Sequence, residues 1–160
     1  MNPYEKDLGG RDPIAALGET PGRIHDVAGK MAPADFGRSY APGKWDARRI
    51  LLHLAHTEMA YGLRLRMALA TEYYVVQPFD QDGWMAREPL VEGPSALGAY
   101  LELRRLNLPL FLSLTAEERG RTLWHPERGA VTISWIVELL AGHDLHHLAQ
   151  LEQILADGRG

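Results

Sequence analysis

The sequence predicts an all-α protein, a four-helix bundle with one long crossover connection. Four segments carry apolar residues at helical spacing, and each is bounded by residues that start or stop helices. No segment shows a convincing strand-like alternation of apolar and polar residues. The chain has 160 residues, 46% apolar and 24% charged, which fits one globular domain over residues 1–160. A bundle is the most economical packing of four such helices.

The first helix has a clear start. Asp12 is placed to cap it, and Pro13 suits its first position. We expect the helix to extend towards Lys30, with a kink at Pro21, where a backbone donor is missing. Residues 1–11 carry no comparable pattern, so they are predicted to form a flexible lead-in.

The second and third helices flank the crossover. A turn over residues 41–44 precedes Asp46, which is expected to cap a helix that continues to about Ala70. Ser95 is expected to open a helix that ends near Leu114. Prolines and glycines interrupt the segment 72–94 between them, which therefore reads as the long connection.

Between the third and last helices the signals are short. Thr115 and Glu118 have the spacing of a capping box, which predicts a brief helical turn. Residues 125–129 (HPERG) read as a turn. A short hairpin is only weakly indicated, near residues 75–76 or 130–131.

Composition excludes several classes of function. The chain has no cysteine, so disulfides, thiolate metal sites and cysteine nucleophiles are ruled out. Its net charge of -4 argues against non-specific binding of nucleic acid. No stretch has the length of an apolar membrane span, and the N-terminus lacks the apolar core of a signal peptide. We therefore expect a cytoplasmic protein with no membrane or nucleic-acid partner.

The last helix places two histidines on its buried face. Thr132 is expected to cap this helix, which runs to about Ala156 and stops at Asp157-Gly158. On an ideal helical wheel, His143 and His147 lie within about 20° of the centre of the apolar stripe, and His146 lies about 80° away. Neutral imidazoles at i and i+4 can chelate one cation, whereas charged ones would be costly to bury. The alternative is a pair of core histidines that bond to polar neighbours.

The second helix supplies further candidates on two apolar stripes. The wheel does not choose between His53 and His56 as a third ligand, and their i, i+3 spacing would let both approach one ion. Glu58 is either an acceptor behind the ligands or a solvated charge, and we favour the solvated charge. Two apolar faces also predict contact with a partner subunit.

The chain resembles the DinB/YfiT-like superfamily in three stretches. They are PGKW with the following RRILLHLAHTE, FDQDGW at 79–84, and HPERGAVTISWIVELLAGHDLHHLAQLEQIL at 125–155. The resemblance implies a four-helix bundle that holds a divalent metal, nickel or zinc, on His53, His143 and His147. His56 stands where many members carry another polar residue. The resemblance also implies a homodimer.

A three-histidine site predicts chemistry at an open coordination position. The resemblance favours a metal-dependent thiol S-transferase that uses a low-molecular-weight thiol, with a metal-dependent hydrolase or a non-enzymatic metal-binding bundle as alternatives. Gln150 either lines the cavity or packs. Arg64 and Arg66 are assigned to a solvated face rather than to an anionic substrate, and His125 to a surface turn.

Overall fold

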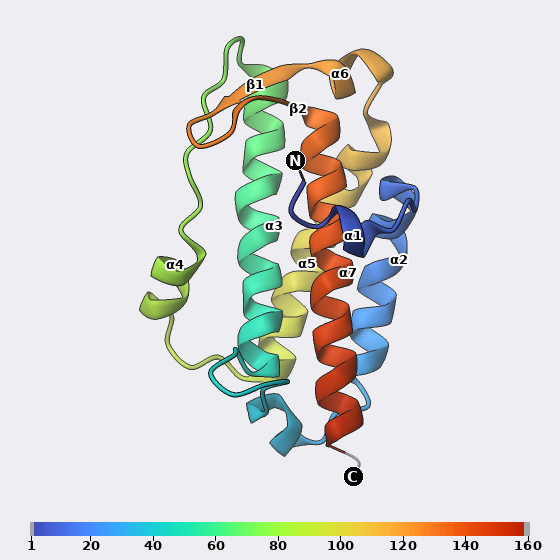
Figure 1. The fold of residues 1–160 in the computed structure, drawn as a ribbon, viewed down its shortest axis with the longest axis vertical. Coiled ribbons are helices and arrows are strands. Elements are labelled where there is room, and N and C mark those ends of the chain that lie inside the picture. The colour runs from blue at the N-terminus through green and yellow to red at the C-terminus, as the bar shows by residue number, and fades with distance from the viewer. Residues whose placement is uncertain (1, 159–160) are drawn as a thin grey trace.

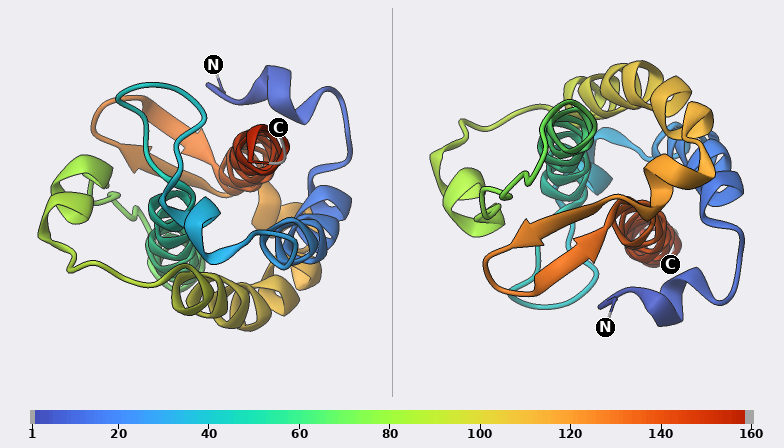
Figure 2. Two further views of the ribbon diagram at one scale, coloured as in Figure 1. Left: turned by 90° about the horizontal axis from the view of Figure 1, so that it is seen from below. Right: turned by 90° about the horizontal axis from the view of Figure 1, so that it is seen from above.

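Four long helices form the body of the protein, α2 (Pro13–Ala28), α3 (Ala47–Ala70), α5 (Gly93–Ser113) and α7 (Ile133–Asp157). The computed structural model describes residues 2–158. Seen end-on, the helices stand at the corners of a square, with α3 beside α5 and α7, and α2 beside α7 and α5 (Figure 2). The predicted four-helix bundle is confirmed. Three of its helices begin at Pro13, Ala47 and Ile133, directly after the predicted caps Asp12, Asp46 and Thr132.

The long crossover exists because α3 and α5 run in the same direction. From the end of α3 the chain passes down the outside of the bundle, through α4 (Gln81–Arg87), to the start of α5 at the opposite end (Figure 1). Asp80 caps α4 by accepting a hydrogen bond from the amide of Gly83. α4 therefore lies against the outer side of α3, beside the histidines of that helix.

Two short strands join α5 to α7 at one end of the bundle. After α6 (Ala116–Gly120), strand β1 (Thr122–His125) pairs antiparallel with β2 (Gly129–Thr132). Val75 adds an isolated parallel bridge to Trp124. Both weakly indicated positions thus take part in strand pairing, and the capping box of Thr115 and Glu118 is present as predicted.

The N-terminal segment differs from the prediction. Residues 5–8 form a short helix, α1 (Glu5–Leu8), which packs against α7 where a flexible lead-in was expected. Gly142 makes this approach feasible, because a Cβ there would lie 2.5 Å from the carbonyl oxygen of Tyr4. The Tyr4 ring in turn meets the His143 ring edge-on at 5.2 Å between centroids. Met1, also part of that predicted lead-in, lies outside the described residues.

One of the two apolar stripes predicted for α3, made of Leu52, Met59, Leu63 and Met67, lies towards the surface. Met59, Leu63 and Met67 are exposed. The homodimer expected from this face stays a prediction. Among the described residues, no helix has the length and apolarity needed to cross a bilayer.

Candidate metal centre

Three buried imidazoles meet between α3 and α7. His53, His143 and His147 each offer a ring nitrogen, and these atoms all lie within 4.8 Å of one another. Nε2 of His53 is 2.9 Å from Nε2 of His143, and all three residues are at most 6% exposed. The three predicted ligands are therefore brought together, from two helices and across 90 residues of sequence between His53 and His143.

The surroundings keep two of the three imidazoles, those of His53 and His147, neutral. Burial, together with the neighbouring His143 and His56, lowers the pKa of His53 to about 2. Burial likewise holds the pKa of His147 well below its usual value, with contributions from His143 and His53. Neutral imidazole is the form that binds a metal ion, so His53 and His147 are already in the protonation state that a metal ligand needs.

Gln150 fixes the orientation of His147. Its side-chain oxygen lies 2.7 Å from Nδ1 of His147 and can only accept, so Nδ1 carries the proton and Nε2 keeps a free lone pair. Its amide nitrogen donates to the hydroxyl of Tyr40 and lies 2.9 Å from Nε2 of His146. Gln150 thus acts behind the cluster, as outer partners of metal-bound histidines commonly do.

Asp144 stands in a similar relation to His143. Its Oδ1 lies 4.0 Å from Nδ1 of His143, and both atoms are buried without a hydrogen-bond partner. A shift of about 1 Å would bring them within hydrogen-bond distance. This arrangement is the one expected if His143 bound a metal ion through Nε2 and donated a hydrogen bond from Nδ1 to Asp144.

His56 does not join the three histidines. It is buried, but its Nε2 lies 3.1 Å from a carboxylate oxygen of Glu88. Trp84 of α4 meets the His56 ring edge-on at 5.4 Å between centroids. His56 is thus paired with the crossover, and of the two candidates on α3 it is His53 that lies beside His143 and His147.

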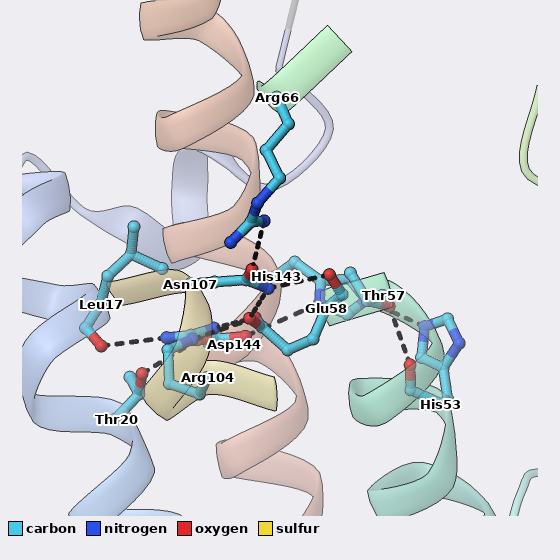
Figure 3. Close-up of polar contacts among 10 residues, drawn as sticks. All are labelled: Leu17, Thr20, His53, Thr57, Glu58, Arg66, Arg104, Asn107, His143 and Asp144. Atoms are coloured by element: carbon cyan, nitrogen blue, oxygen red, sulfur yellow. Dashed lines mark hydrogen bonds and ion pairs between the residues drawn. The ribbon is translucent and has the colours of Figure 1, made fainter. Parts of the chain in front are cut away.

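A buried ionic cluster lies directly behind the histidines (Figure 3). Arg104 of α5 is 1% exposed, and its Nη2 donates to Glu58 of α3 and to Asp144 of α7, each at 2.6 Å. Its Nη1 donates to the carbonyl oxygen of Leu17 in α2. One guanidinium therefore links all four long helices. Glu58, expected to be solvated, is 1% exposed and ion-paired, which corrects that prediction.

Asn107 completes this cluster. Its amide donates to the Glu58 carboxylate at 2.9 Å and its oxygen accepts from Arg66 at 2.7 Å. Gly62 leaves room for the Asn107 side chain, because a Cβ at position 62 would lie 2.5 Å from the side-chain nitrogen of Asn107. The sequence does hold a signal for the cluster, because Arg104 and Asn107 share the helical stripe of Tyr100 and Phe111.

A pocket opens onto the histidines. It has a volume of about 160 Å³, and His53 and His143 form part of its wall together with Tyr61, Arg64 and His125. Arg64 and His125 were assigned to the surface, yet they are 5% and 9% exposed. Arg64 contacts Gln77 at the start of the crossover, and His125, the last residue of β1, lies in the same pocket wall. A larger cavity of about 810 Å³ lies elsewhere, between residues 68–75 and 121–124, and touches none of the three histidines.

Fold and site together define a class of protein, a helical bundle with three converging histidines in its interior. Residues 16–151 match the DinB superfamily, so the chain belongs to that family. "Putative metal-dependent hydrolase OB0413" of Oceanobacillus iheyensis is 29% identical over 147 residues, which cover 90% of this chain and 80% of that protein. "Putative metal-dependent hydrolase YfiT" of Bacillus subtilis is 26% identical over 144 residues, covering 88% and 81%.

A solved structure supports the fold. YfiT from Bacillus subtilis, described as "a probable metal-dependent hydrolase with an unusual four-helix bundle topology", superposes with a TM-score of 0.83. The match covers 92% of this chain and 86% of that chain at 22% sequence identity. The likeness confirms the fold.

Proposed function

We propose that His53, His143 and His147 bind one divalent metal ion, nickel or zinc, and that the protein is a metal-dependent enzyme. The observation that carries the proposal is that two of the three imidazoles also line a pocket. A metal site enclosed by protein ligands on all sides has a structural role. Three protein ligands beside a pocket leave a coordination position open for a reactant. An ion there supplies Lewis acidity that activates water, or the sulfur of a small thiol, as a nucleophile.

Hydrolysis is the activity that we place first. It needs only water and a substrate in the pocket, and relatives across most of the chain carry the name of metal-dependent hydrolases. Thiol S-transfer is the second candidate, because this cysteine-free chain would take its sulfur nucleophile from a low-molecular-weight thiol. In both cases the protein contributes three buried imidazoles and a pocket beside them.

Metal analysis of histidine variants tests the proposal. His143→Ala and His147→Ala should each lose most of the metal that the purified wild type retains, because two nitrogens cannot replace three. His146→Ala is the matched control, since His146 is a neighbour on the same helix outside the cluster. Full metal content in the two cluster variants would show that the assigned ligands are wrong.

Turnover then separates the activities. Ester or amide cleavage by the metal-loaded protein without added thiol supports hydrolysis, while turnover that requires a thiol supports S-transfer. If bound metal raises the melting temperature but neither assay shows turnover, the protein is a non-enzymatic metal-binding bundle.

Gln150 offers a subtler prediction for the same site. Gln150→Ala should weaken metal binding by about 10- to 100-fold, because Nδ1 of His147 loses the acceptor that fixes its tautomer. Gln153→Ala is the control, since Gln153 follows on the same helix and bonds only to the carbonyl of Tyr40. Competition with a chelating dye measures both affinities. Equal affinities would mean that Gln150 merely packs against the ring.

A further inference from the structure

Arg64 is a buried cation without a counter-charge. It is 5% exposed on α3, and the arginine ion pairs within residues 2–158 belong to other residues: Arg23, Arg38, Arg48, Arg104 and Arg105. Its Nη2 donates a hydrogen bond to the carbonyl of Gln77 at 2.7 Å, which anchors one end of the guanidinium. Its carbon lies 4.6 Å from the centroid of the Tyr61 ring. A guanidinium buried in this way lacks the anion that normally compensates it.

The pocket beside the histidines is where that anion can sit. Arg64 lines it together with Arg128, and the single carboxylate among its lining residues is Glu127; Arg128 and Glu127 are both exposed, so Arg64 is the buried charge of the pocket. The balance of charge in the pocket is therefore positive. Burial lowers the pKa of His125, and so do the charges of Arg64 and Arg128, although Glu127 acts in the opposite direction.

The neutral groups of the pocket are also hydrogen-bond donors. Nδ1 of His125 accepts from the amide of Glu127 at 3.2 Å, so the ring proton is on Nε2. Burial raises the pKa of Tyr61, which keeps its phenol protonated at neutral pH. Arg64, Tyr61 and His125 thus combine a fixed positive charge with two neutral donors, a set suited to oxyanions.

We propose that this pocket binds an oxyanion, a carboxylate or phosphate group of the substrate, on Arg64 and holds the rest of the molecule towards the three histidines. The inference rests on the proposed function for the reacting end of the substrate, and on the unpaired guanidinium for the anionic end. A volume of about 160 Å³ accommodates a small charged group rather than a whole large ligand. The substrate class is therefore a small organic acid derivative or phosphate ester.

Equilibrium binding of simple anions tests the inference. Acetate, succinate and inorganic phosphate are titrated by calorimetry into wild type, Arg64→Gln and Arg105→Gln, with metal content measured for each. Arg105 is the control, because it is exposed on α5 and pairs only with Glu102. We expect Arg64→Gln to weaken binding of the preferred anion by about 10- to 100-fold, the usual effect of a hydrogen bond to a charged group, and Arg105→Gln to leave it unchanged.

Each outcome either supports or overturns the proposed anion site. A preference for acetate and succinate identifies a carboxylate site, and a preference for inorganic phosphate identifies a phosphate site. Equal affinity in wild type and Arg64→Gln, or no anion binding by wild type, overturns the inference. If Arg64→Gln fails to fold, Arg64→Met removes the same charge with an apolar side chain, and unchanged affinity there would be equally contradictory. Arg64-dependent binding by metal-free wild type would support the anion site even if the proposed metal chemistry failed.

Discussion

Arg104→Met should lower the free energy of unfolding by about 3–5 kcal/mol, the range measured when one partner of a buried ion pair is removed. The change leaves the carboxylates of Glu58 and Asp144, each 1% exposed, without their cation in the centre of the bundle. Burial opposes ionisation of Asp144, but the charge and hydrogen bond of Arg104, together with the effect of His143, lower the pKa of that carboxyl. Without Arg104 the same burial would favour the protonated acid.

Urea unfolding of wild type and variant measures the effect. Arg105→Met is the matched control, because the neighbouring residue is exposed and should change stability little. The combined variant Arg104→Met, Glu58→Leu, Asp144→Leu should be more stable than Arg104→Met alone, because no unpaired charge stays buried. Equal unfolding midpoints for wild type and Arg104→Met would show that the cluster contributes nothing to stability.

Metal-free protein should lose about 3 kcal/mol of stability between pH 7.5 and pH 5.5 from two histidines alone. The folded-state pKa of His53 is about 2 and that of His147 is also strongly lowered, whereas both titrate near pH 6.5 in the unfolded chain. As pH falls through 6.5 the unfolded state takes up protons that the folded state does not. The contribution of each histidine is therefore complete above the unfolded pKa and falls progressively below it.

Denaturant unfolding in the presence of a strong chelator, at several pH values, measures this loss. His53→Gln should remove about half of the two-histidine contribution, because one of the two groups no longer titrates. His25→Gln is the control, since His25 is exposed and lies outside the cluster. A stability of wild type that does not change over this interval would mean that His53 and His147 titrate normally in the folded protein.

The long helices and the histidine pair were predictable because their signals are local. Caps at Asp12, Asp46 and Thr132 and the i, i+4 spacing of His143 and His147 can be read within a few turns of one helix. The third histidine was not fixed by periodicity, since His53 and His56 both lie on buried parts of α3. Glu88 and Trp84 distinguish them, and both come from a crossover whose path no periodic pattern reveals.

The ionic cluster was missed for a related reason. Charged residues on a helix are usually solvated, and the partners that reverse this for Arg104 lie 46 and 40 residues away. Arg64 was assigned to the surface for the same reason, although segments distant in sequence cover it. Long-range pairing of charges becomes visible only once the helices are placed side by side.

The two helices that carry the histidines lie far apart in the sequence, and this separation sets when the site can form. His53 belongs to α3, whereas His143 and His147 belong to α7, the last helix described. The contacts between α2 and α7 likewise join opposite ends of the described chain. Such long-range contacts close late in folding, because the loss of chain entropy comes before the gain from packing. During synthesis, the three proposed ligands can therefore come together only after α7 has been made.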